Sequence, residues 1–341
     1  MKVLNIGSNS IHVSSFLNRM DEVDNYLFVE EPCGFLSTDK EFEFKIRSFN
    51  IFKLIINLLR IRSSIKKISP DIIHIHQLNR FAFIVGLIAS KNIPVISTAW
   101  GSDVLIMPWK NKIFYYVTKF LIKRSTIVTA DSFDMISKMN KIVSNDNKYV
   151  RLQYGIQRIE AQEKQNIIYS NRLHKPLYRI SSIIDYFAEF VQENNFWKLV
   201  IAGTGEDTTT LKNQVSSLGV DDKVVFVGWL DQKQNHDFFA KSKVYISIPS
   251  SDGTSVSLLE AMSAGCVPIV SDLQVTKEWI KHNENGIIEQ KNKNPFFEID
   301  NLDLKKVSEL NQNVLENNHV FTERAIDAFK ELYKSILKTR Y

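Results

Sequence analysis

The chain has 341 residues, of which 44% are hydrophobic and 24% charged, and its formal net charge is +5. This length predicts two domains, each able to bury its own core, and the apolar fraction excludes a disordered chain. The cysteines, Cys33 and Cys266, are too few for a disulfide scaffold or a cysteine-rich zinc site. No apolar run reaches the length of a transmembrane helix, and the N-terminus lacks the apolar core of a signal peptide. A cytoplasmic protein is therefore expected.

Basic residues are concentrated in the first half of the chain. Residues 1–156 contain 21 Lys and Arg against 13 Asp and Glu, whereas the remainder contains 22 and 25. This asymmetry predicts an anionic partner for the first half, either nucleic acid or a membrane surface.

Short β-rich runs alternate with helical stretches, a pattern typical of α/β proteins with parallel sheets. In the first half we expect strands at 3–6, 26–29, 72–75, 94–97 and 127–129 and helices at 51–68 and 80–89. In the second half we expect strands at 167–169, 199–202, 224–227, 244–248 and 267–270 and helices at 180–192, 208–217, 235–240, 257–263 and 325–337. Two such series predict two Rossmann-like domains, joined by the polar segment 157–166. A solvated loop is expected at 281–294.

The most informative segment, 249–271, runs from the end of a predicted strand through a turn at Gly253 into a helix that contains Glu260. The first N–H groups of a helix lack partners within it and suit a phosphate. Here they belong to Thr254, Ser255 and Val256. The alternative is an ordinary strand–turn–helix in which Asp252 caps the helix.

This segment resembles the signature of the retaining glycosyltransferases of family 4, in which two glutamates are separated by seven residues. The matching positions are Pro249, Ser250, Asp252, Gly253, Thr254, Ser255, Leu259, Glu260, Ala261, Met262, Gly265 and Pro268. The resemblance implies that Glu260 binds the donor ribose and that Asp252 positions the donor sugar. Asp252 replaces the first glutamate, so its carboxylate is one methylene shorter.

Residues 169–175 resemble the Gly-Arg-x-x-x-x-Lys-Gly segment that opens the second domain of the family. There the Arg and Lys bind the donor diphosphate, whose growing charge in the transition state fixed cations stabilise. Arg172 matches, and Lys175 is preferred to Arg179 for the displaced lysine. The alternative is two surface cations at the end of a strand.

Residues 199–206 resemble a strand and turn of the family, and Gly203 is expected at the donor. Taken alone, Gly203 and Gly205 also match the first two glycines of an NAD-binding motif, but the third glycine of that motif is replaced by Thr208. Beyond the next strand, Trp229 or Leu230 would border the nucleotide base, or would pack in the core.

In the first half, residues 71–76 resemble the family's Asp-Val-Val-His-x-His strand. Alternation places His74 and His76 on one face. His76 is then a candidate for the cleft between the domains, and His74 for a buried structural residue. The pair also admits a metal site, although no third ligand stands at a suitable spacing.

Residues 96–103 resemble the family's His-Gly-x-Asp segment, with Trp100 in place of the histidine. Asp103 is expected near the acceptor hydroxyl or the donor sugar, or else as a helix cap. Residues 5–10, ending in Ser10, replace a glycine loop over the donor phosphates.

Two stretches combine basic and apolar residues. The expected helix at 51–68 carries Lys53, Arg60, Arg62, Lys66 and Lys67. Such a helix can lie on an anionic bilayer, or can be a core helix with one solvated face. A second surface of this kind is offered by Tyr115, Tyr116 and Phe120, which stand beside Lys112, Lys119, Lys123 and Arg124.

As a whole, the resemblance implies the GT-B fold. An acceptor-binding Rossmann-like domain would span 1–156 and a nucleotide-sugar-binding one 157–322, with a cleft between them. A C-terminal helix over 323–341 would pack on the first domain.

The implied reaction transfers a sugar, with retention, from a UDP- or GDP-sugar to a hydroxyl of a glycan or polyprenyl-diphosphate-linked acceptor. Its expected role is in making cell-surface polysaccharide or lipopolysaccharide, at the inner face of the cytoplasmic membrane. The leaving diphosphate can itself take the acceptor proton, so no Ser-His-Asp triad is needed. No cofactor is expected, and no metal ion, because no Asp-x-Asp pair stands at the end of a predicted strand. The basic first half suggests a membrane-borne acceptor rather than nucleic acid, because the phosphate-binding motifs lie in the second half. The alternatives are a catalytically inactive GT-B partner subunit and an NAD-dependent oxidoreductase.

Overall fold

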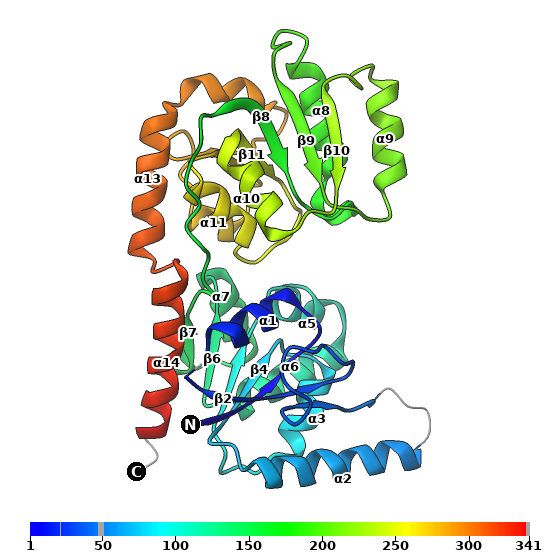
Figure 1. The fold of residues 1–341 in the computed structure, drawn as a ribbon, viewed down its shortest axis with the longest axis vertical. Helices are drawn as coiled ribbons and strands as arrows, with labels where there is room; N and C mark the ends of the chain where they lie inside the picture. The colour runs from blue at the N-terminus through cyan, green and yellow to red at the C-terminus, as the bar shows by residue number, and fades with distance from the viewer. Residues whose placement is uncertain (21, 47–50, 339–341) are drawn as a thin grey trace. The chain divides into compact units, whose positions relative to one another are not determined.

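A computed structural model describes residues 1–20, 22–46 and 51–338. The chain forms two compact units (Figure 1). Unit 1 holds residues 1–155 and the segment from Thr322 onward, and unit 2 holds Ile156–Phe321. Within the described part of the chain, no helix is both long and apolar enough to cross a membrane.

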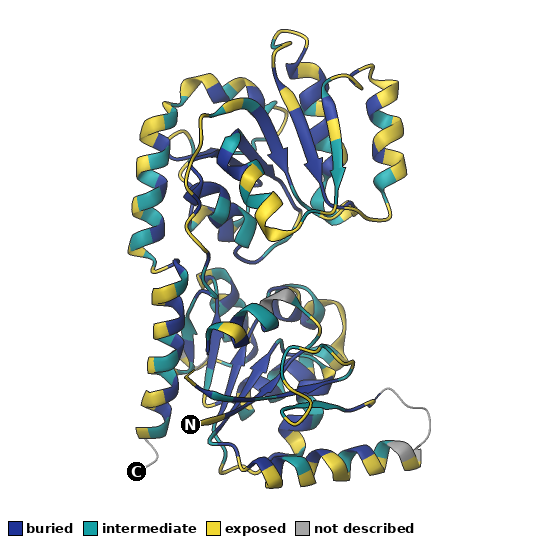
Figure 2. Ribbon diagram, in the orientation of Figure 1, coloured by how far each residue is buried: buried dark blue, intermediate teal, exposed yellow. Residues whose placement is uncertain are grey.

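Unit 1 is built on a parallel sheet with the order β3-β2-β1-β4-β5-β6-β7. Its strands are β1 (Lys2–Ile6), β2 (Asp24–Val29), β3 (Glu41–Glu43), β4 (Ile72–His76), β5 (Val95–Thr98), β6 (Ile127–Ala130) and β7 (Tyr149–Arg151). The central strands β1, β4 and β5 are almost entirely buried, as expected for a parallel sheet covered on both faces (Figure 2).

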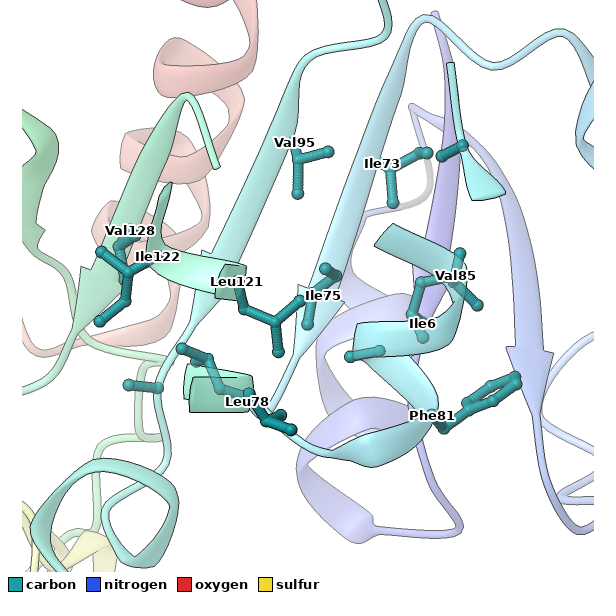
Figure 3. Packing of buried hydrophobic residues seen from close by; sticks show 14 of the residues in the cluster. Ile6, Ile73, Ile75, Leu78, Phe81, Val85, Val95, Leu121, Ile122 and Val128 are labelled. Carbon is teal, nitrogen blue, oxygen red and sulfur yellow. The ribbon is translucent and has the colours of Figure 1, made fainter. Parts of the chain in front are cut away.

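Helices cover both faces of this sheet. They are α1 (Ile11–Arg19), α2 (Ile51–Ile68), α3 (Arg80–Ile88), α4 (Ser102–Leu105), α5 (Met107–Lys110), α6 (Lys112–Arg124), α7 (Phe133–Ile142) and α14 (Thr322–Lys338). Buried residues of α2, α3, α6 and α7 share one core cluster with Leu4, Ile73 and Ile75 of the sheet, part of which Figure 3 shows. Residues of α1 and α14 instead share a cluster with Val3 and Ile72. Neighbouring strand residues thus serve opposite cores.

The C-terminal helix α14 belongs to unit 1. Phe329 and Tyr333 are fully buried, and the Tyr333 hydroxyl lies 2.6 Å from Nδ1 of His74 on β4. Nε2 of His74 lies 2.7 Å from the Thr98 hydroxyl. Burial, with His76 as a lesser cause, lowers the pKa of His74 well below its usual value. The neutral ring is therefore a satisfied part of the core, as the sequence predicts for His74.

Unit 2 has a second parallel sheet, with the order β10-β9-β8-β11-β12-β13. Its strands are β8 (Gln165–Ser170), β9 (Lys198–Ala202), β10 (Val224–Gly228), β11 (Ser242–Ser247), β12 (Val267–Val270) and β13 (Ile287–Ile288). Its α-helices are α8 (Ile180–Phe190), α9 (Thr208–Ser217), α10 (Gln232–Lys241), α11 (Val256–Ser263), α12 (Gln274–Lys277) and α13 (Leu304–Asn317). The two expected Rossmann-like domains are confirmed.

Every strand expected from the sequence is present, with ends shifted by at most two residues. The pattern misses the short edge strands β3, β7 and β13, and the helices that it misses include α1, α6, α7 and α13. The solvated loop expected at 281–294 is confirmed only in part. A turn at 283–285 and residues 291–293 are largely exposed, but the segment also contains β13 and buries Asn285 and Ile287. The expected linker at 157–166 is also too long, since β8 already begins at Gln165.

The bond between Tyr333 and His74 gives a stability prediction. Tyr333→Phe leaves Nδ1 of His74 buried without its partner, which costs about 1–3 kcal/mol of unfolding free energy. Urea unfolding followed by circular dichroism measures this loss. The control Tyr116→Phe, on a side chain that is 66% exposed, should change stability by less than ~0.5 kcal/mol. Equal stability of the two variants would contradict the assignment.

Candidate functional site

The predicted residues of unit 2 gather where strands β8 and β11 lie side by side in the sheet. The chain leaves β8 towards β9 on one side, whereas β11 continues to β12 on the other. Loops at the carboxyl ends of two such strands diverge, and open α/β sheets bind ligands at this position. Here the two loops are 171–179 and 248–255.

Arg172, in the first of these loops, reaches the second. One guanidinium nitrogen donates to Oδ2 of Asp252 and another to Oγ of Ser255, both at 2.7 Å. The guanidinium also lies over the ring of Tyr178, 4.4 Å from its centroid. The Arg172 side chain is only 13% exposed, so three contacts fix its direction. The structure thus brings together three residues, Arg172, Asp252 and Ser255, that the sequence placed at one site.

Both carboxylate oxygens of Asp252 accept hydrogen bonds in this cluster. Oδ2 pairs with Arg172, and Oδ1 accepts the N–H of Gly253 at 3.1 Å. Burial raises the pKa of the Asp252 carboxyl, and the neighbouring guanidinium opposes that shift. The alternative of an Asp252 cap is not what the structure has, because Ser255 caps α11 by accepting the Leu258 N–H.

The start of α11 lies at the same loop, because its cap residue Ser255 accepts a hydrogen bond from Arg172. The first N–H groups of a helix have no partner within the helix. Val256 is the first residue of the helix, and the preceding Thr254 is buried with its hydroxyl 3.3 Å from the indole nitrogen of Trp279. Glu260 lies one turn further along, where Oε1 is 3.3 Å from Nε2 of His236 on α10. Sequence reasoning missed His236, because no motif links α10 to α11.

Gly203 and Gly205 pack closely against the backbone of the loop that contains Arg172. A Cβ on Gly203 would lie 2.6 Å from the carbonyl oxygen of Arg172, and one on Gly205 would lie 2.3 Å from that of His174. Only glycine allows this close approach, and Gly203 also has a positive φ of 96°. The hydroxyl of Thr208 fills the turn, where it accepts the Gly205 N–H. These glycines therefore place the backbone of Arg172.

The second cation of the motif differs from the expectation. Lys175 is exposed and forms no ion pair among the described residues. Arg179 makes two bonds of 2.7 and 2.9 Å to Glu289. Arg179 also has a φ of 53°, the left-handed conformation that favours glycine, and it directly follows Tyr178. The sequence did not reveal the roles of Tyr178 and Glu289.

Trp229 and Leu230, the two candidates for a contact with the nucleotide base, lie in the loop after β10 and differ in their exposure. Trp229 is 72% exposed, whereas Leu230 is half-buried and packs against the core cluster that includes Leu258. The described structure thus leaves Trp229 accessible to a planar ligand and uses Leu230 mainly for packing.

The histidine expected at the cleft, His76, is fully buried within unit 1. Its Nε2 lies 3.0 Å from Oδ1 of Asn5, an oxygen that can only accept, so Nε2 carries the proton. Its Nδ1 lies 3.2 Å from the hydroxyl of Tyr154. Burial lowers the pKa of His76 to about 3. Both ring nitrogens are engaged, which favours a structural role for His76.

Asp103 is likewise buried, and its carboxylate accepts the N–H groups of Leu78 at 2.8 Å and Trp100 at 3.0 Å. Burial raises the pKa of Asp103, and these backbone bonds oppose the shift. The indole of Trp100 donates to the Tyr154 hydroxyl at 2.7 Å. Asp103 therefore holds the β5–α4 connection through these backbone bonds, and its place near the acceptor hydroxyl or the donor sugar stays a prediction. Ser10 lies directly before α1, where its carbonyl accepts the N–H of Ser14.

A cavity of about 770 Å³ lies beside this site, at the carboxyl ends of β12 and β13. It is lined by Arg179, Glu289, Lys277, His282 and other polar residues, but not by Arg172 or Asp252. The space around Asp252 is a narrow hollow of about 10 Å³. In the described part of the chain, no group of three or more His, Cys, Asp or Glu side chains is arranged to hold a metal ion.

The close approach of Gly203 to Arg172 gives a testable prediction. Gly203→Ala should lower the free energy of unfolding by about 2 kcal/mol or more, because its Cβ would meet backbone that cannot move aside. Gly219→Ala is the matched control, since Gly219 also has a positive φ but has open space around it. Urea unfolding of both variants separates the clash from the shared backbone strain. Equal losses would show that Arg172 does not depend on this turn.

Comparison with known proteins covers both units. The profile of the family "Glycosyl transferases group 1" matches residues 155–297, and that of "Glycosyl transferase 4-like" matches residues 11–132. N-acetyl-alpha-D-glucosaminyl L-malate synthase of Bacillus anthracis is 22% identical over 299 residues, which cover 79% of this chain and 75% of that protein.

Solved structures resemble the chain over nearly its full length. The structure of HepE from Anabaena in complex with UDP and glucose has a TM-score of 0.80 at 13% identity, covering 98% of this chain and 100% of that one. The apo form of the lipopolysaccharide outer core galactosyltransferase WaaB has a TM-score of 0.72 at 15% identity, covering 98% and 99%. Both units match glycosyltransferase profiles, and the whole chain matches their two-domain fold. The chain therefore belongs to the group 1, family 4-like glycosyltransferases and has the GT-B fold.

Proposed function

We propose that the protein transfers a sugar from a nucleotide-sugar, a UDP- or GDP-sugar, to a hydroxyl of a glycan or polyprenyl-diphosphate-linked acceptor, with retention at the anomeric carbon. The observation that carries this proposal is the fixed guanidinium of Arg172, held by Asp252 and Ser255 at the start of α11. A helix start and a fixed cation together favour a diphosphate.

In the proposed reaction, negative charge grows on the diphosphate as its bond to the sugar breaks. A cation that is already oriented stabilises this charge without reorganising in the transition state. Arg172 supplies that cation, and the exposed Lys175 can turn towards the diphosphate because no ion pair restrains it among the described residues. Backbone N–H groups at Thr254, Ser255 and Val256 add donors.

The remaining donor contacts follow from the same geometry. Glu260 would accept the ribose hydroxyls, with His236 holding its carboxylate. Asp252 would hold Arg172 and also face the donor sugar. Its side chain, one methylene shorter than the glutamate of the motif, is compatible with both contacts. The exposed ring of Trp229 could stack on the nucleotide base.

Proton transfer needs no further side chain in this proposal. An oxygen of the leaving diphosphate takes the acceptor proton on the face from which the diphosphate departs, which gives retention. Unit 1 would bind the acceptor, with buried His76 and Asp103 shaping its loops rather than touching the substrate. We propose that neither a metal ion nor a cofactor takes part.

Two relatives support the substrate classes. HepE was solved with UDP and glucose, and WaaB is named as a galactosyltransferase of the lipopolysaccharide outer core. We propose a related role for this chain in cell-surface polysaccharide or lipopolysaccharide synthesis, at the inner face of the cytoplasmic membrane.

Two substitutions test the donor site. Glu260→Ala and Arg172→Ala should each lower kcat/KM by about 100-fold or more, because a charged contact to the donor is lost. Arg172→Lys should recover part of the activity, since it keeps the charge but not the two-armed geometry. Rates with a defined UDP- or GDP-sugar, together with melting curves, measure these effects. Glu309→Gln and Lys198→Gln, on exposed residues of unit 2, are the controls and should match the wild type.

Folded variants of Glu260 and Arg172 with wild-type kcat/KM would refute the assigned roles. Failure of the wild type to use any nucleotide-sugar would favour an inactive partner subunit. Stabilisation by NAD in place of UDP or GDP would favour the oxidoreductase.

The stereochemical outcome is a separate prediction. With an α-linked donor and EDTA in the buffer, proton NMR of the initial product should show the α-anomer, at the same rate as without EDTA. A β-linked product would overturn the diphosphate-assisted route. If EDTA abolished activity and added Mg²⁺ restored it, the proposal that no metal ion takes part would be overturned.

A further inference from the structure

The outer face of α2 carries large apolar side chains where a water-exposed helix normally carries polar ones. Phe52, Ile55, Ile56 and Leu59 are between 48% and 74% exposed. Helical spacing places them on one side, opposite the buried residues Asn57, Ile61, Ile65 and Ile68, which face the rest of unit 1. The core therefore accounts for one face of α2 and leaves its apolar outer face unexplained.

Two further helices packed beside α2 also carry exposed apolar residues. α3 packs against both α2 and α6, and Gly86 of α3 lies within 3.5 Å of Leu121 and Phe120 of α6, measured from an added Cβ. Leu87 of α3 and Ile113 and Tyr116 of α6 are each more than half exposed. We name these three helices, with their exposed apolar residues, the α2–α6 surface.

The charge of the α2–α6 surface has a single sign. The sequences of α2, α3 and α6 contain ten Lys and Arg and no Asp or Glu. On α2, the apolar residues occupy the first turns, and exposed Arg62, Lys66 and Lys67 continue the same side towards its end. Apolar and cationic groups thus lie together on one helix.

We propose that the α2–α6 surface binds a bilayer containing anionic lipid, with the first turns of α2 inserted among the acyl chains and its last turns against the phosphates. Large exposed apolar patches are unfavourable in water, and a bilayer removes them from it. Each Lys or Arg near an anionic surface adds attraction. A nucleic acid would pair with the cations but would leave the apolar side chains of Ile56 and Leu59 exposed to water. This inference does not depend on sugar transfer.

The test measures co-flotation of the whole chain with vesicles. Wild-type protein should bind vesicles of phosphatidylcholine mixed with phosphatidylglycerol, and bind phosphatidylcholine alone much more weakly. Ile56→Ser/Leu59→Ser should weaken binding by about tenfold or more. Lys66→Gln/Lys67→Gln should weaken it by about fivefold for each lysine, on the mixed vesicles only.

The matched controls lie in unit 2. Phe196→Ser/Leu218→Ser also removes exposed apolar residues, and Lys305→Gln/Lys306→Gln also removes two adjacent exposed lysines. Both should bind vesicles as the wild type does, and all variants should keep its melting temperature. Vesicle binding is measured without the sugar donor or acceptor. A protein that fails to bind vesicles can therefore be distinguished from one that fails to transfer sugar.

Several outcomes would overturn the proposal. One is no binding of wild type to the mixed vesicles, and another is equal loss in the controls. Binding to duplex DNA that needs Lys66 and Lys67 but not Ile56 and Leu59 would assign the surface to nucleic acid. A dimer in light scattering that Ile56→Ser/Leu59→Ser dissociates would assign it to a second copy of the chain.

Discussion

The ion pair between Arg172 and Asp252 holds together the two loops of the proposed donor site. It joins the loop after β8 to the loop after β11, two segments 80 residues apart in sequence. Ser255, which caps α11, and the ring of Tyr178 complete the support of the guanidinium. Both side chains are largely buried, so removing one partner of the pair would leave the other charge uncompensated, and the two residues are needed together. The pair therefore fixes a cation at a helix start before any ligand binds.

Polar groups in unit 1 play a different part. His76, Tyr154, Trp100 and Asn5 form a buried chain of hydrogen bonds near the carboxyl ends of β1, β4 and β5. Burying such groups is tolerated only when their bonds are satisfied, as they are here. Two residues that the motifs place at the substrate, His76 and Asp103, are thus held inside unit 1 by hydrogen bonds to their neighbours.

The sequence predicts the strands, the two domains and the residues that meet around Arg172, because alternation and the 249–271 motif are local signals. It does not predict Glu289 as the partner of Arg179, nor His236 beside Glu260, since these pairs join elements that only the folded sheet brings together. Gly203 is a further example. Its position in a turn suggests a ligand, but the backbone of Arg172 occupies the space beside it.

If the Arg172 cluster recognises a diphosphate as proposed, a nucleoside diphosphate must bind far more tightly than its nucleoside. Calorimetric titration of the whole chain with UDP and GDP, and with uridine and guanosine, measures this difference. One diphosphate should bind about 100-fold or more tightly than its nucleoside, with an affinity that falls as salt is raised. Equal affinities of a nucleoside and its diphosphate would exclude recognition of the diphosphate by this cluster.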